Sequence, residues 1–139
     1  MAATFAPGAR LSALDVSVIV VAAVVSVYLS SITWWWGAGL AFVVGHFFLF
    51  CNIVRMARPL ELVWATMFTG LAAMTILTRS PSPAATAGLS LLVTLVVVVI
   101  ELRKPSYHGL GWKTINPNLP NWWNQHVTVS RPENAEALA

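Results

Sequence analysis

Four apolar stretches fill most of this chain, at about residues 14–32, 34–54, 60–78 and 86–102. Each is close to the roughly 20 apolar residues with which an α-helix crosses a bilayer at about 1.5 Å per residue. Lone strands are excluded there because the backbone must satisfy its own hydrogen bonds inside lipid. The expected fold class is therefore all-α: a polytopic membrane protein with four transmembrane helices in two antiparallel hairpins.

The composition favours lipid over water as the solvent of this chain. Hydrophobic residues make up 58% and charged residues 9%, whereas soluble domains are roughly 25% charged. A single cysteine excludes an internal disulfide and a multi-cysteine zinc site. The basic residues form no patch interleaved with stacking aromatics, so no nucleic acid partner is expected.

The distribution of basic residues predicts the orientation in the membrane. With four spans, the N-terminus, the link after the second span and the C-terminal tail lie on one side. Seven of the eight Lys and Arg residues fall there, and Arg79 falls on the other side. The positive-inside rule then predicts an inner (cytoplasmic) membrane protein with both termini in the cytoplasm.

The chain divides into three parts. Residues 1–12 are a short cytoplasmic N-terminus, residues 13–104 hold the four-helix transmembrane domain, and residues 105–139 form a cytoplasmic tail. The tail is rich in Trp and Pro and shows no helical or strand period, so we expect it to be extended. Its aromatic side chains are typical anchors for a partner protein or for the membrane surface. The docking candidates are Tyr107, Trp112, Trp122 and Trp123.

Small residues repeat along one face of the second helix. Gly37, Ala41 and Gly45 are spaced by four, which places them on a single face where another helix approaches closely. We therefore predict a helix-packing face there. Chance is the alternative, since small residues are common in membrane helices.

His46 lies near the middle of the second span, where an ionisable side chain is costly and commonly functional. The favoured interpretation is a neutral imidazole held by an interhelical hydrogen bond. Two alternatives stay open: axial ligation of a chlorophyll or bacteriochlorophyll, or of a haem, and a proton relay. No second histidine lies in a predicted span, which argues against a bis-histidine haem.

A charged group follows the second span. Arg55, Arg58 and Glu61 suit either a lipid-headgroup site or an ion pair that also sets the topology. Asp15 and Glu101 stand at helix ends of the same side, where we expect solvated carboxylates.

These features predict a non-catalytic accessory subunit of a larger integral-membrane complex, with membrane lipids and other integral-membrane subunits as partners. It would pack through its second helix and clamp its partners with the tail; a respiratory or photosynthetic complex is the host that analogy favours. No enzyme motif is present. The alternatives are a pigment- or haem-binding membrane protein with His46 as axial ligand, and a small homo-oligomeric transporter.

Overall fold

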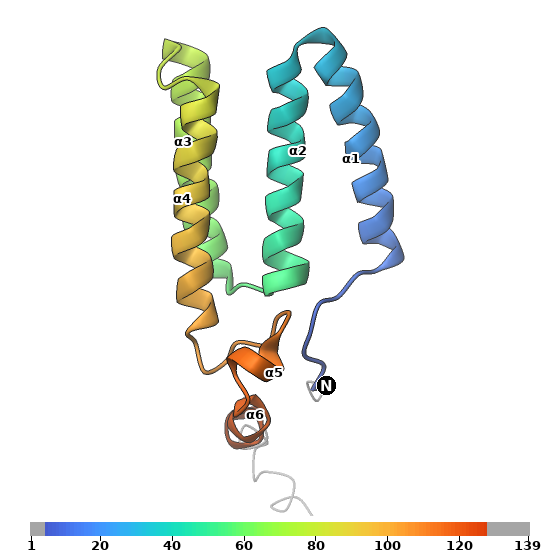
Figure 1. The fold of residues 1–139 in the computed structure, drawn as a ribbon, viewed down its shortest axis with the longest axis vertical. Coiled ribbons are helices and arrows are strands. Elements are labelled where there is room, and N and C mark those ends of the chain that lie inside the picture. The colour runs from blue at the N-terminus through green and yellow to red at the C-terminus, as the bar shows by residue number, and fades with distance from the viewer. Residues whose placement is uncertain (1–4, 128–139) are drawn as a thin grey trace, which may run out of the picture.

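The computed structural model describes residues 5–127, where all regular secondary structure is helical. The long helices are α1 (Ala13–Ile32), α2 (Trp34–Phe48), α3 (Arg58–Thr78) and α4 (Pro83–Leu102). With α2 continued to Val54, these are four helices long and apolar enough to span a membrane. They alternate in direction (Figure 1). We call the end with the α1–α2 and α3–α4 connections the hairpin end. The opposite end, where residues 5–12, the α2–α3 connection and the tail meet, is the basic end.

A capping box begins α1. The Ser12 backbone N–H donates to the Asp15 carboxylate at 2.7 Å, and the Asp15 N–H donates to the Ser12 hydroxyl at 3.2 Å. Two N–H groups that the helix leaves unpaired are thus satisfied reciprocally. Asp15, expected only to be solvated, in fact fixes where α1 begins.

The second span does not remain α-helical to its end. After Phe48 the chain winds as a π-helix, η1 (Leu49–Val54), and it leaves at Arg55 with φ 54° and ψ 51°. The Met56 N–H closes this turn on the Phe50 carbonyl at 2.8 Å. A π-helix widens the hydrogen-bonded ring and recurs at functional sites. Apolar spacing alone does not reveal it, so the sequence predicted a uniform helix.

Hydroxyl groups join α3 to α4. The Thr75 and Thr86 hydroxyls lie 2.5 Å apart, and Ser90 and Thr94 are buried on the same face of α4. Helix α4 begins at Pro83 rather than near residue 86, because Ser82 caps it by accepting from the Ala85 N–H. Proline fits the first helical turn, where its missing N–H is not needed.

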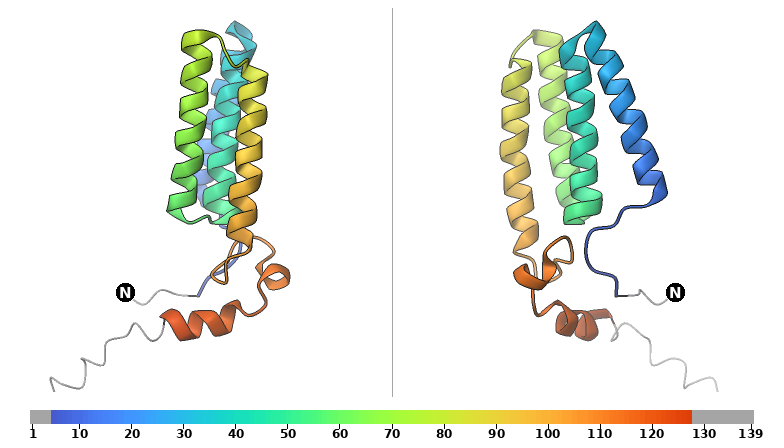
Figure 2. Two further views of the ribbon diagram at one scale, coloured as in Figure 1. Left: turned by 90° about the vertical axis from the view of Figure 1, so that its left-hand side faces the viewer. Right: turned by 45° about the vertical axis from the view of Figure 1, so that its right-hand side comes forward.

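The prediction of an extended tail is wrong over two segments. Helices α5 (Trp112–Ile115) and α6 (Leu119–Val127) form there, and α6 lies across the bundle axis at the basic end (Figure 2). Of the prolines that indicated an extended arm, Pro105 and Pro117 precede α6 and Pro120 stands in its first turn, where a proline does no harm. Leu119 is fully buried, so tertiary contact supports a helix too short to form alone. Residues 128–139 of the predicted tail lie outside the described range.

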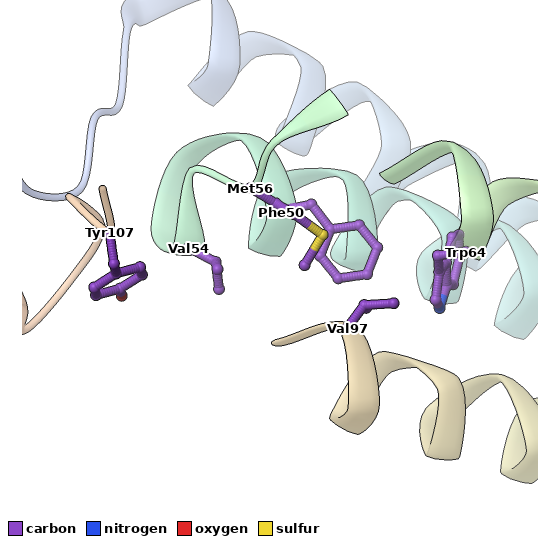
Figure 3. Packing of buried hydrophobic residues seen from close by; sticks show 6 residues of the cluster. All are labelled: Phe50, Val54, Met56, Trp64, Val97 and Tyr107. Atoms are coloured by element: carbon purple, nitrogen blue, oxygen red, sulfur yellow. The ribbon is translucent and has the colours of Figure 1, made fainter. Parts of the chain in front are cut away.

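The hydrophobic core lies toward the basic end (Figure 3). It combines η1, the α2–α3 connection, α3, α4 and the start of the tail, through Phe50, Val54, Met56, Trp64, Val97 and Tyr107. In contrast, only 6% of the residues in the most apolar stretch of α1 are buried, against 33% in the corresponding stretch of the second span. Helix α1 is thus the peripheral element, and it packs on α2.

Candidate functional site

His46 is buried in the centre of the aromatic packing between α2 and α3. Its side chain is 7% exposed, and Nδ1 lies 2.8 Å from the Phe42 carbonyl oxygen one turn earlier. A carbonyl only accepts, so this contact requires the hydrogen on Nδ1, and in the neutral imidazole the lone pair is then on Nε2. The hydrogen bond is therefore made within α2, and it is not the interhelical bond that the sequence favoured.

Trp64 of α3 stacks against the imidazole. The two rings are nearly parallel, at 15° with centroids 4.6 Å apart, and Phe68 also stacks on Trp64, at 5.2 Å. The indole N–H donates to the Thr94 hydroxyl at 2.8 Å and also approaches the Ser90 carbonyl at 3.3 Å. Trp64 thus connects α2, α3 and α4. Sequence reasoning missed this residue, although a tryptophan inside an apolar span, away from the usual interfacial belt, was a signal.

The remaining nitrogen of His46, Nε2, is buried and has no hydrogen-bond partner within residues 5–127. Buried polar atoms without a partner are uncommon. The chain offers no group of three metal-binding side chains in the same range. A metal in a tetrapyrrole would bind at Nε2, but the tight packing means that neighbouring side chains must move to admit it.

The group predicted at the end of the second span does not form its expected ion pair. Among the described residues, neither Arg55 nor Arg58 makes a salt bridge with Glu61. The Arg55 guanidinium instead donates to the Ala6 carbonyl at 2.6 Å, and Glu61 accepts from the Cys51 thiol at 3.6 Å. The structure brings the three charged residues to one place without pairing them.

These three side chains line a cavity of about 620 Å³ at the basic end, which is widely open to its surroundings. Its wall also includes Phe47, Met56 and Glu101. Burial lowers the pKa of the Arg55 guanidinium, and the nearby charge of Arg10 lowers it further. The guanidinium is thus partly withdrawn from water while it faces no carboxylate, which is an arrangement that favours an anionic ligand.

Glu101 is not the solvated carboxylate that the sequence predicted. It is 3% exposed, and the Lys104 ammonium lies 2.6 Å from its carboxylate. In the sequence, the short spacing between Glu101 and Lys104 was the signal for this ion pair. The burial of Glu101 arises because the tail folds back over this end of α4. Burial also raises the pKa of the Tyr107 phenol above its ordinary value, and Glu101 adds to the shift.

The predicted docking aromatics of the tail pack largely against the chain itself. Tyr107 is 2% exposed and donates to the Leu110 carbonyl at 2.7 Å. Trp112 and Trp123 both make edge-on contacts with Phe5, at 6.0 and 5.5 Å. Trp122 stacks on His126 of the same helix. Through these contacts, the tail joins the N-terminal segment to the bundle.

Gly109 permits the tail to lie against the end of the second span, and sequence reasoning missed this residue as well. A Cβ at this position would collide with the Val54 carbonyl, and would lie 2.7 Å from the Ile53 carbonyl and from the Tyr107 hydroxyl. The adjacent Leu110 N–H donates to the Ile53 carbonyl at 2.8 Å. The π-helix of the second span and the tail are thus joined through their backbones.

Helix α1 covers one part of the predicted packing face of α2 and leaves the rest of it exposed. Gly37 is buried against Ser26 and Ser30, so closely that a Cβ would strike both. Ala41 is exposed, and no atom lies within 4 Å of the position that a Cβ of Gly45 would occupy. In Figure 1 the two helices separate toward the basic end. Within residues 5–127, only the first member of the predicted face is covered.

Comparisons with known proteins identify no relative: no family model, no curated protein and no solved structure matches this chain.

Proposed function

We propose that this chain is a non-catalytic accessory subunit of a larger integral-membrane complex in the inner (cytoplasmic) membrane. The observation that carries the proposal is the uncovered part of the α2 packing face, at Ala41 and Gly45. Small residues give lipid chains little to contact, whereas they let a second helix approach the backbone closely. Because α1 diverges from α2 below Gly37, a helix of another subunit has access to this face.

The charge distribution supports an orientation with both termini in the cytoplasm. Arg10, Arg55, Arg58 and Arg103 lie at the basic end, and Arg79 follows α3 at the hairpin end. Basic residues are retained on the cytoplasmic side of inner-membrane proteins. By analogy, a respiratory or photosynthetic assembly is the first host to examine.

In this proposal, fewer aromatic residues of the tail are available to a partner than the sequence suggested. Tyr107 is already used to attach the tail to the bundle. Trp122 and Trp123 keep intermediate exposure on α6, which lies across the bundle axis. We assign the contact with a partner, or with the membrane surface, to this helix.

The decisive variant is Gly45→Leu, which places a large side chain on the uncovered face, where no atom of residues 5–127 lies within 4 Å of the new Cβ. The tagged protein is purified in a gentle detergent, and co-purifying membrane proteins are quantified by mass spectrometry. We expect a stoichiometric partner with the wild type and about a tenfold loss with Gly45→Leu, equivalent to about 1.4 kcal/mol. Gly88→Leu is the matched control, because Gly88 is also exposed with no atom near its Cβ position. A wild-type chain that purifies as a partner-free monomer would refute the proposal.

A cofactor-binding role for His46 is the second candidate, and the unpartnered Nε2 is the observation in its favour. A chlorophyll-type pigment or a haem bound there predicts a visible absorption band in the purified protein. His46→Ala should then abolish the band, while Phe47→Ala, on an exposed side chain, should retain it. A colourless, folded wild-type protein isolated from its native membrane would exclude this role.

A further inference from the structure

We propose that the 620 Å³ cavity at the basic end binds the headgroup of a membrane aminophospholipid, with the phosphate at Arg55 and Arg58 and the primary ammonium at Glu61. The common chemistry is a phosphate ester joined to a primary amine by a short linker. The inference does not depend on the accessory role, since a lipid site is compatible with any function of the bundle.

The first argument is the charge left unpaired in the cavity. Within residues 5–127, Arg55 and Arg58 form no ion pair, and Glu61 has the weakly donating Cys51 thiol as its side-chain hydrogen-bond partner. Arg55 and Glu61 are half-buried, whereas Arg58 is exposed, and charged groups partly withdrawn from water are more stable when they are paired and hydrogen-bonded. A ligand that carries both signs satisfies the guanidinium groups and the carboxylate together.

Arg55 is positioned as an anion-binding residue. It follows the π-helix in a left-handed conformation, and one of its N–H groups is held by the Ala6 carbonyl at 2.6 Å. This bond uses Nη1, and within residues 5–127 the other N–H groups of the guanidinium form no hydrogen bond or salt bridge, so they stay available to an anion beside the cavity wall that Arg55 lines. Arginine presents a planar set of donors that matches two phosphate oxygens.

Arg58 and Glu61 supply the complementary pair of charges. They are three residues apart on α3, so they are neighbours on one helix face, with Cβ atoms roughly 5–6 Å apart. A phosphate beside Arg58 therefore brings an ammonium on a two-carbon linker within reach of Glu61. Glu101, the other carboxylate in the wall, is already neutralised by Lys104 at 2.6 Å.

The apolar side of the cavity points to a lipid as the source of the headgroup. Phe47 belongs to the membrane-spanning part of α2 and is 50% exposed, while buried Met56 supplies further apolar wall. The cavity thus continues from charged groups at the end of a span onto a side chain at acyl-chain depth. A soluble phosphate ester would leave Phe47 uncovered.

The carboxylate also selects among lipids. An anionic glycerol headgroup has no ammonium and leaves Glu61 unpaired beside its phosphate. A choline headgroup carries the positive charge but has no N–H to donate. An ethanolamine headgroup provides both the charge and the hydrogen bonds, so the cavity should prefer phosphatidylethanolamine.

The test measures lipid affinity by native mass spectrometry on the delipidated full-length protein. Phosphatidylethanolamine, phosphatidylglycerol and phosphatidylcholine with identical acyl chains are titrated separately. We expect the ethanolamine lipid to bind about tenfold more tightly than the other two, which corresponds to about 1.4 kcal/mol. Equal affinity for the three lipids would overturn the proposal.

Single substitutions test the phosphate site and the ammonium site separately. Arg58→Gln, which removes an exposed guanidinium, should weaken all three lipids by a similar factor of about ten. Glu61→Gln should remove the preference for the ethanolamine lipid while phosphate binding persists. Arg103→Gln is the control, because Arg103 is an exposed arginine at the same end and outside the cavity wall. A Glu61→Gln protein with an unchanged preference contradicts the ammonium assignment.

Soluble O-phosphoethanolamine distinguishes the two sources of this chemistry. If the lipid is the ligand, millimolar O-phosphoethanolamine should displace little bound phosphatidylethanolamine. Displacement at the lipid's own affinity would overturn the lipid assignment.

Discussion

Replacing Gly37 by alanine is expected to destabilise the bundle by about 3 kcal/mol, because the added methyl group has no room. The new Cβ would strike the Ser26 carbonyl and the Ser30 hydroxyl, and the Ser30 backbone nitrogen would lie 2.8 Å away. Two of these atoms belong to the α1 backbone, so a side-chain rotation cannot relieve the clash. The helix itself must move away from α2.

Gly39→Ala is the control for this experiment, because no atom lies within 4 Å of its Cβ position. In an unfolding titration in mixed micelles, Gly39→Ala should be neutral or slightly stabilising, since alanine favours the helix over glycine. Equal free energies of unfolding for the two variants would show that α1 does not pack on α2 at Gly37.

The second large effect is expected for Trp64→Ala, which should lower the free energy of unfolding by about 3–5 kcal/mol. Trp64 is 5% exposed, stacks with His46 and Phe68, and donates to Thr94 of α4. The substitution removes the packing that joins three helices and leaves a cavity between them. It also exposes the imidazole of His46 to whatever enters that cavity.

Two further variants divide this effect into its parts. Trp64→Phe retains an aromatic ring but loses the N–H, so it should cost about 0.6–2 kcal/mol, the range for an interhelical hydrogen bond in a membrane. Trp34→Ala, on a side chain that is 69% exposed, should change the free energy by less than about 0.5 kcal/mol. Similar losses for Trp34→Ala and Trp64→Ala, measured by the same titration, would contradict the central position of Trp64.

Two buried polar residues, His46 and Glu101, show how far the structure could be predicted from the sequence. It identified His46 as exceptional, because an ionisable group inside an apolar run stands out from its neighbours. The sequence did not predict the contacts of His46: the imidazole forms a hydrogen bond within its own helix and stacks on Trp64, which lies in another span. Glu101 was misjudged for a related reason, since the tail that buries it begins only after α4 ends.

The amino-acid sequence alone determined the number, approximate position and helical nature of the four candidate spans. Those properties follow from apolar length and from backbone hydrogen bonding in lipid, both of which are local. The clustering of Arg55, Arg58 and Glu61 was likewise visible as proximity along the chain.

Only the tertiary structure decided which faces are covered and which charges stay unpaired. The π-helix before Arg55, the divergence of α1 from α2 and the folding of the tail onto Ile53 and Val54 each depend on contacts between distant segments. Such contacts are set by packing and by the pairing of backbone groups across elements, which leave no periodic trace in the sequence. For that reason the cavity at the basic end, and the uncovered face at Gly45, emerged only from the folded chain.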